Sequence, residues 1–200
     1  MSNGQLETVK LTARFKLDGE VDESLFKTYK AVVNELLDYA HSKGITSFER
    51  LKSEKYHEMR RKYPELPSHY IYTACQLARS IYKSFRKLKR RGKVKKDRPL
   101  LRKNVIMLDD HLFSLDLESW KVSISTPYGR RRFELLHGKY HKRFRDWKVG
   151  QAWLVRTPEG IFLNVVFSRE IEVEEPKAFV GTDLNENNVT LSLPNGEFVK

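Results

Sequence analysis

The chain has 200 residues, of which 40% are hydrophobic and 32% charged, and its formal net charge is +12. This composition is typical of a globular protein rather than a disordered one, and no apolar run is long enough to span a bilayer. The single cysteine, Cys75, excludes an internal disulfide and a cysteine-based zinc site, so we expect no zinc site in this chain. The N-terminus has no secretory signal, and we therefore expect a cytoplasmic protein stabilised by packing alone.

The first elements follow from the spacing of apolar residues. Alternation of apolar and polar residues over 6–17 predicts a half-buried strand. Three helices are expected next, over 22–44, 47–63 and 68–92, each bounded by capping residues, glycine or proline. The third helix has the clearest apolar stripe, with alternating spacings of three and four residues.

Short strands separated by turn residues follow the helices. The predicted strands are 105–108, 112–117, 120–125, 131–136, 152–156 and 161–167. Many short strands at this spacing favour a small antiparallel barrel. Because segment 6–17 has no local partner, we expect it to join that barrel, which makes the helices an insertion between the first and second strands.

The C-terminal part begins with an acidic stretch, 170–176, which indicates a linker. Beyond it, 178–184 and 189–193 are expected to be strands, and 193–197 a hairpin turn whose Asn-Gly pair tolerates positive φ. Two or three strands are not stable alone, so this ribbon is predicted to be the start of a further domain.

The positive charge is concentrated in two segments. Residues 83–103 hold twelve Lys/Arg against Asp97 alone, and residues 130–148 hold eight against two acids. Such segregation produces a local potential suited to a polyanion, although a solvated helix end is the alternative. The candidate binding residues in these clusters are Lys83, Arg86, Lys87, Arg90, Arg91, Lys93, Lys95, Lys96, Lys142, Arg143 and Arg145.

Aromatic residues are interleaved with the second cluster. Tyr140, Phe144 and Trp147 could stack on unpaired bases while the neighbouring cations meet phosphates. The alternative is that these rings belong to the barrel core, which is favoured for Trp147. His137 and His141 have the spacing of a metal pair on a helix, but no third ligand accompanies them and no metal site is expected there.

One face of the third helix is polar and offset from the apolar stripe. It carries Ser68, Tyr72, Gln76, Arg79 and Lys83. Polar side chains in this arrangement can read base edges in a groove. An ordinary solvent-exposed face is the alternative.

Asp183 lies inside an otherwise apolar predicted strand. A buried unpaired carboxylate is costly, so such a residue usually has a function. Metal-dependent phosphodiester cleavage uses clustered carboxylates to hold Mg²⁺, and a strand-borne aspartate is a suitable first member. The alternative is an aspartate that caps a turn together with Asn185 and Asn187.

Two stretches together resemble a known family. Phe179–Leu193 resembles the first RuvC motif of TnpB proteins, the transposon-encoded (OrfB-type) RNA-guided nucleases related to type V CRISPR effectors, and 66–87 resembles the end of their recognition helices. The resemblance implies an α+β fold, with a small wedge-like antiparallel β-barrel, an inserted helical bundle and the first strands of an RNase H-like (RuvC) domain. The implied parts are the first barrel strand (1–18), the recognition bundle (19–98), the rest of the barrel (99–172), a linker (173–176) and the RuvC start (177–200).

The resemblance also implies a function. The protein would bind a guide RNA and its double-stranded DNA target in association with the nucleoid, with no membrane partner, and the polar face of the third helix would lie beside the target-adjacent duplex. Asp183 would be the first catalytic carboxylate and a Mg²⁺ ligand only in a complete RuvC domain. The family's further carboxylates and its four-cysteine zinc element have no counterpart here, so we expect no cleavage by this chain alone. The alternatives are a naturally truncated, binding-only relative and an unrelated structural RNA-binding protein; the sequence carries no signal of oligomeric state.

Overall fold

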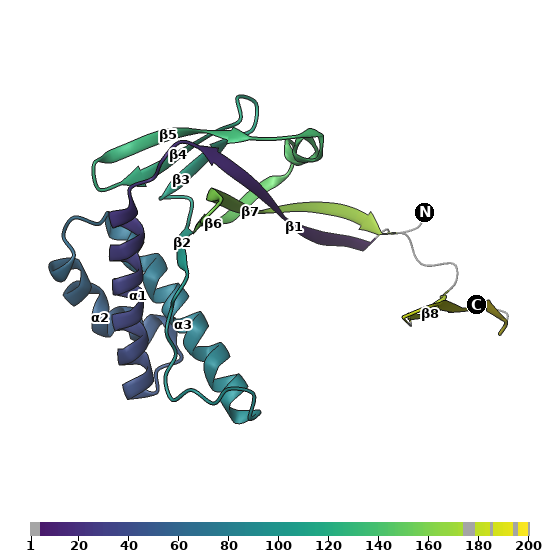
Figure 1. The fold of residues 1–200 in the computed structure, drawn as a ribbon, viewed down its shortest axis with the longest axis horizontal. Coiled ribbons are helices and arrows are strands. Elements are labelled where there is room, and N and C mark those ends of the chain that lie inside the picture. The colour runs from purple at the N-terminus through teal and green to yellow at the C-terminus, as the bar shows by residue number, and fades with distance from the viewer. Residues whose placement is uncertain (1–4, 174–178, 185, 194–195, 200) are drawn as a thin grey trace. The chain divides into compact units, whose positions relative to one another are not determined.

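The computed structural model describes residues 5–173, 179–184, 186–193 and 196–199. The chain divides into two compact units, one of residues 10–168 and the other of residues 1–9 and 169–200. Along the chain, one strand is followed by three helices and then by a run of strands (Figure 1).

Three helices follow the first strand. They are α1 (Glu23–Lys43), α2 (Phe48–Lys62) and α3 (Ser68–Arg90). The Asp22 carboxylate accepts a hydrogen bond from the Ser24 amide at 2.8 Å at the start of α1, and Gly44 ends that helix with a φ of 67°. Ser47 caps α2 in the same way as Asp22 caps α1. The three predicted helices are confirmed, because each predicted end lies within a few residues of the observed end.

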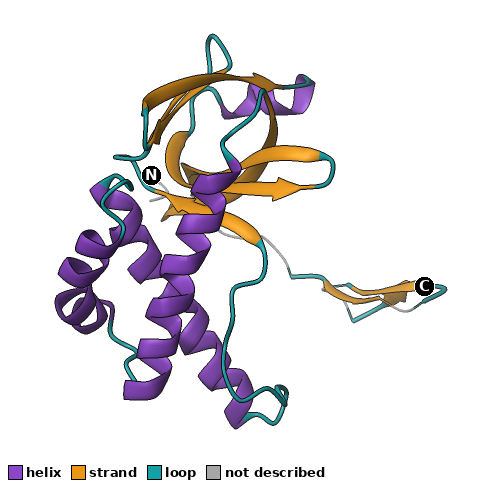
Figure 2. Cartoon of the chain, turned by 60° about the vertical axis from the view of Figure 1, so that its left-hand side comes forward, coloured by secondary structure: helices purple, strands orange, loops and turns teal. Residues whose placement is uncertain are grey.

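Seven strands form one sheet that curves into a nearly closed antiparallel barrel (Figure 2). They are β1 (Gln5–Asp18), β2 (Asn104–Leu108), β3 (Phe113–Asp116), β4 (Lys121–Thr126), β5 (Gly129–Leu136), β6 (Lys148–Thr157) and β7 (Gly160–Val173). The strand order is β2-β6-β7-β1-β5-β4-β3. The first strand therefore joins the barrel, as predicted, where it lies between β7 and β5, and the three helices are inserted between β1 and β2.

A bulge in β6 bends the sheet. Val149 pairs with Phe167 and Ala152 with Val165, so β6 has one more residue than β7 over this interval. Gly150 lies in the bulge, where an added Cβ would stand 3.0 Å from the carbonyl oxygen of Val166. Glycine is therefore the residue that lets the two backbones approach closely.

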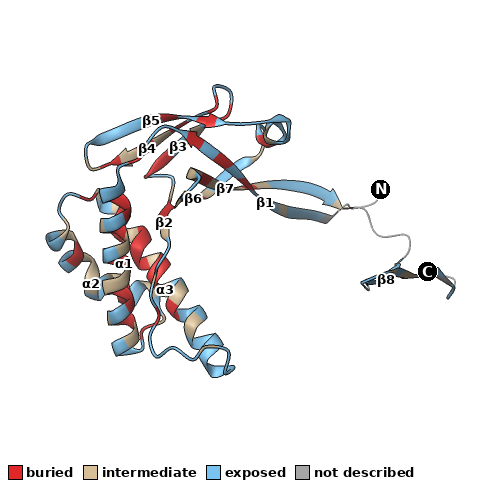
Figure 3. Ribbon diagram, viewed as in Figure 1, coloured by how far each residue is buried: buried red, intermediate tan, exposed pale blue. Residues whose placement is uncertain are grey.

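The helices pack onto the barrel through a continuous core (Figure 3). In the helical part the rings of Tyr29 and Tyr70 meet edge to face at 6.0 Å, and Tyr70 donates a hydrogen bond to the carbonyl of Ser125 on β4. In the barrel the ring of Phe167 contacts those of Phe15, at 6.3 Å, and Phe144, at 4.7 Å. The α+β class with an antiparallel barrel is confirmed, and none of the helices in the described ranges is long and apolar enough to cross a membrane.

The C-terminal strands form a separate antiparallel sheet. They are β8 (Gly181–Leu184), β9 (Val189–Ser192) and β10 (Phe198–Val199), with β9 in the middle. The prediction that 170–176 is a linker is wrong for residues 170–173, which continue β7. Ile171 and Val173 alternate with two glutamates there, and period-two alternation favours a strand whatever its charge. Residues 174–176 of the predicted linker lie outside the described part.

Candidate functional site

The first basic cluster lies at the C-terminal end of α3 and in the loop that follows, and we call residues 83–103 the basic end. Every lysine and arginine in it has an exposed side chain. Figure 1 shows that this end of α3 points away from the barrel. Lys89 bridges the loop by donating to the Lys96 carbonyl and the Asp97 carboxylate, both at 3.3 Å, so the loop folds back beside the helix.

The loop is fixed farther along by one side chain of α1. The Asn34 amide accepts a hydrogen bond from the Leu101 backbone N–H at 2.8 Å and donates one to the Leu101 carbonyl at 3.2 Å. Between the loop and α3 lies a cleft of about 1030 Å³. Apolar side chains such as Ile81 and Leu88 line it together with cationic ones such as Arg98. Such a surface can cover the flat face of a base or sugar while its cations meet phosphate.

A smaller cleft of about 310 Å³ opens between the end of α1 and α3. The His41 ring meets the rings of Tyr82 and Phe85 edge to face, with centroids 5.9 Å apart in each case. The Lys89 Nζ lies 5.8 Å from the Phe85 centroid, and the Arg86 guanidinium carbon lies 6.0 Å from that of Tyr82. Rings and cations therefore share one recess, which the sequence did not reveal because His41 and α3 are far apart in the chain.

The second basic cluster is built around η1 (Lys139–Phe144), a short 3-10 helix. Lys142, Arg143 and Arg145 are exposed, and the Arg143 guanidinium carbon lies 5.5 Å from the centroid of the Tyr140 ring. Tyr140 is 54% exposed, whereas Phe144 is buried. Trp147 is partly buried against the core, so Tyr140 is the ring of this cluster that can stack on a base.

The two histidines of this cluster make structural bonds. The Nδ1 of His141 accepts a hydrogen bond from the Gly138 backbone N–H at 2.9 Å, which leaves Nε2 to donate to the Arg14 carbonyl, also at 2.9 Å. Both ring nitrogens of His141 are therefore engaged in joining η1 to β1. His137 stacks on Trp120 with ring centroids 4.1 Å apart.

The predicted base-reading face of α3 is partly covered. Tyr72 meets Phe48 edge to face at 5.1 Å, and the Nε of Arg79 donates to the Thr46 carbonyl at 3.0 Å. These two residues and Gln76 are half-buried, while Ser68 and Lys83 are exposed. The start of α2 and the turn before it therefore occupy the middle of this face, and base reading by it stays a prediction.

Asp183 lies in β8, opposite Thr190 of β9. All four residues of β8 are exposed, so the expectation of a buried carboxylate is wrong for this strand. No group of three or more metal-ligand side chains in the described part of the chain includes Asp183. Of its expected turn partners, Asn187 is exposed and Asn185 lies outside the described residues.

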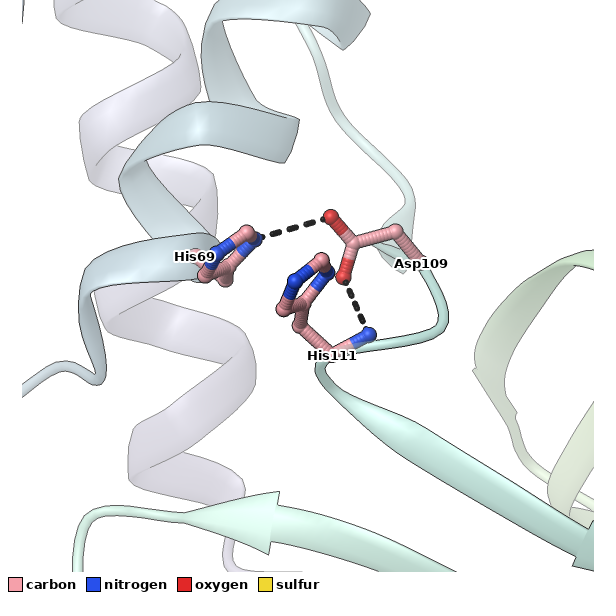
Figure 4. A group of neighbouring side chains, drawn as sticks. All are labelled: His69, Asp109 and His111. Carbon is pink, nitrogen blue, oxygen red and sulfur yellow. Dashed lines mark hydrogen bonds and ion pairs between the residues drawn. The ribbon is translucent and has the colours of Figure 1, made fainter.

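A group that the sequence did not predict joins the start of α3 to the β2–β3 turn (Figure 4). The His69 Nδ1 lies 3.0 Å from the Asp109 Oδ2, and the Asp109 Oδ1 accepts a hydrogen bond from the His111 backbone N–H at 3.2 Å. The two imidazole rings stack with their centroids 3.9 Å apart. One ligand atom from each residue lies within 4.8 Å of the others, a spacing from which a metal ion could be held.

Comparison with known proteins identifies the family. The model of the uncharacterized protein MJ0013 family matches residues 25–125, which is about half of the chain. The chain belongs to the MJ0013 family. Two curated relatives of this MJ0013-family protein come from Methanocaldococcus jannaschii and are described as uncharacterized proteins. MJ0857 is 28% identical over 229 residues, which cover 97% of the chain and 82% of the relative, and MJ0752 is 36% identical over 77 residues, which cover 38% of the chain and 99% of the relative.

The range matched by the family model contains some candidate sites of this MJ0013-family protein and leaves others outside. Residues 25–125 include the basic end and its clefts, together with His69, Asp109 and His111. The second basic cluster and Asp183 lie outside the matched range. The descriptions of the family and the two relatives name no activity, so the resemblance to TnpB stays a prediction.

Proposed function

We propose that this MJ0013-family protein binds nucleic acid through the basic end of α3. The observation that carries the proposal is the concentration of twelve exposed cations against one acid in residues 83–103. Dense positive charge attracts a polyanion at long range and gains affinity by releasing its counterions. A helix end needs only one or two cations to offset its dipole, so capping alone does not account for a cluster of this size.

The clefts beside the basic end favour a ligand with aromatic bases as well as phosphates. Phe85 contributes to both clefts and is half-buried, and cations of the loop line the larger cleft while cations of α3 line the smaller one. The second cluster adds Tyr140 at the barrel side of the molecule, where an exposed ring lies beside Arg143. Folded RNA presents phosphate arrays and unpaired bases together, so we take structured RNA as the preferred ligand.

The finer form of the proposal follows the resemblance to TnpB. The barrel and the basic end would hold a guide RNA, the helical insertion would meet the target DNA, and residues 177–200 would begin an RNase H-like domain. The element order supports this form, with a barrel, inserted helices and then a strand that carries Asp183. A binding-only relative, or an RNA-binding protein unrelated to transposition, would use the same basic surfaces without Mg²⁺ chemistry.

Salt dependence of binding tests the proposal. In a basic-end variant, five exposed cations are changed to glutamine, namely Arg90, Arg91, Lys93, Lys95 and Lys96. A helix-control variant loses the same charge from α1 and α2, at Lys27, Arg50, Lys55, Arg61 and Lys62. The two variants have equal net charge and lose it at different places. Four of the control cations, Lys27, Arg50, Lys55 and Lys62, are ion-paired, so circular dichroism must show that the control stays folded.

We expect the basic-end variant alone to lose affinity and salt dependence. Each lost phosphate contact lowers the slope of log K against log salt by about 0.9 on duplex DNA and about 0.7 on single strands, or roughly four- to fivefold in affinity at about 0.15 M salt. Equal loss in both variants would show that net charge and not this surface governs binding. Equal competition by structured RNA and duplex DNA of the same length would contradict the preference for RNA, and a flat salt response of the parent protein would refute the proposal.

A further inference from the structure

We propose that His69, Asp109 and His111 form a binding site for a divalent transition metal of the zinc class, contrary to the expectation of no zinc site, which rested on the lack of cysteines. Two imidazoles and one carboxylate are the ligand set that proteins use for zinc and iron(II) sites with open positions. Calcium and magnesium prefer oxygen ligands alone, so this set selects against them. The site does not rest on the proposed nucleic-acid binding, because none of its three ligands belongs to either basic cluster; Arg130 of the second cluster contacts only the His111 backbone.

The three side chains are already gathered to nearly the required spacing. A zinc ion holds nitrogen and oxygen ligands at about 2.0–2.2 Å, which places tetrahedral ligand atoms roughly 3.4 Å from one another. The His69 and Asp109 atoms are 3.0 Å apart, and all three ligand atoms lie within 4.8 Å of one another. Closing the site therefore shortens the widest spacing by up to roughly 1.4 Å and requires the third ligand to turn.

His111 is the ligand that must move. The two rings are almost parallel, with an interplanar angle of 9°, whereas a bound metal lies in the plane of each imidazole that it contacts. The His111 side chain is 60% exposed, against 36% for His69, so its ring is the one free to turn. Its Nδ1 lies 3.1 Å from the Asp110 carboxylate, a partner that can orient the ring and leave Nε2 for a metal.

The backbone beneath the ligands is fixed on both sides. The Asp109 carbonyl accepts hydrogen bonds from the backbone N–H groups of Leu112 and Phe113, and Arg130 donates to the His111 carbonyl at 2.8 Å. On the helix side, the buried Tyr70 next to His69 is bonded to Ser125 of β4. Side-chain rotation is therefore enough to complete the site, and the exposed side of His111 leaves room for a water or substrate ligand.

Metal titration of the tag-free, chelator-stripped full chain tests the proposal. Competition with a chromophoric chelator measures Zn²⁺ affinity, and Co²⁺ absorption reports nitrogen and oxygen ligation. We expect one equivalent of tight binding that raises the melting temperature. His69→Ala, His111→Ala and Asp109→Asn should each weaken it by at least about tenfold, the loss seen when even a supporting partner of a ligand is removed.

His57→Ala is the matched control, because it removes a histidine on α2 that lies outside the group. It should leave the stoichiometry and affinity unchanged. His111→Ala is the decisive variant, since its exposed side chain can be removed without opening the core, and circular dichroism checks its fold. Unchanged Zn²⁺ affinity in folded His111→Ala, or no binding by the parent protein, would overturn the proposal and leave the group as a structural contact between α3 and the β2–β3 turn.

Discussion

Asn34 allows the position of the loop that follows α3 to be tested separately from the charge of that loop. Its side chain forms two hydrogen bonds with the backbone of Leu101, at 2.8 and 3.2 Å, across 67 positions of sequence. Asn34→Ala removes both bonds and leaves every cation in place. Each such bond contributes about 1 kcal/mol net, and Leu101 is half-buried so that water replaces part of the loss. We expect the loop to be destabilised by roughly 1–2 kcal/mol.

This loss should appear first as local opening. Residues 83–103 are rich in trypsin sites, and cleavage of a transiently open segment follows its open population. A change of 1–2 kcal/mol raises that population by roughly 5- to 30-fold, so tryptic cleavage in the loop should accelerate by the same factor. The melting temperature should fall by only about 2–8 °C. Nucleic-acid affinity should also fall, although the net charge is unchanged.

Ser42→Ala is the control for this experiment. It removes a hydrogen bond that Ser42 donates to the Tyr39 carbonyl within the same helix, rather than one to the loop. Cleavage of the control should match that of the parent protein. If Asn34→Ala also matched the parent in cleavage rate, the loop would not depend on Asn34 for its position and the reasoning would be refuted.

Three further outcomes are expected. Asp183→Ala should leave nucleic-acid affinity unchanged. The parent chain should show no Mg²⁺-dependent cleavage in a nuclease assay, since no metal-ligand group in the described residues includes Asp183. Cleavage that the substitution abolishes would contradict this. Burial raises the pKa of the Cys75 thiol to about 12, so a thiol-reactive dye should label it only in denaturant; rapid labelling of the native protein would show that the site opens. Tyr140→Ala should weaken single-stranded RNA binding by roughly 5- to 150-fold, the loss of affinity expected when the stacking of one base is removed. It should leave duplex DNA binding unchanged. The same substitution at Tyr128, which is 83% exposed in the β4–β5 turn, should have no effect on either ligand, and equal effects of the two would argue against stacking.

The helices and the barrel could be predicted because their signals are local or repeated. Asp22, Ser47 and Gly44 act on amide and carbonyl groups within four residues, so the helix ends can be read from short windows. The strands alternate with period two, and an unpaired first strand must find partners elsewhere in the sheet. The interpretation of 170–173 as a linker failed because it gave the glutamates more weight than the alternation of Ile171 and Val173.

The candidate sites differ in whether the residues that form them are neighbours in the sequence. The basic end is a single run of sequence, so its charge is visible before any folding is considered. Its clefts are not, because they require His41 of α1 and the loop around Leu101 to meet α3. Burial of Asp183 was inferred from its apolar neighbours, but a strand buries a face only when another layer covers it, and β8 is exposed along its length.

The group of His69, Asp109 and His111 is the hardest site to predict, because the sequence around His69 gives no sign that it meets the segment with the other two residues. His69 stands in the first turn of a helix, and Asp109 to His111 have the composition of an ordinary turn. The two segments meet across 40 positions because α3 packs against β2, which leads into the turn, and Tyr70 anchors the start of α3 to β4. A variant that loosens this docking, such as Tyr70→Phe, should therefore weaken metal binding without touching a ligand, while the basic end, which depends on Asn34 for its position, should bind nucleic acid as before. Loss of both activities together would mean that the two sites are coupled through α3, and loss of neither would mean that the packing of α3 holds the metal ligands without this hydrogen bond.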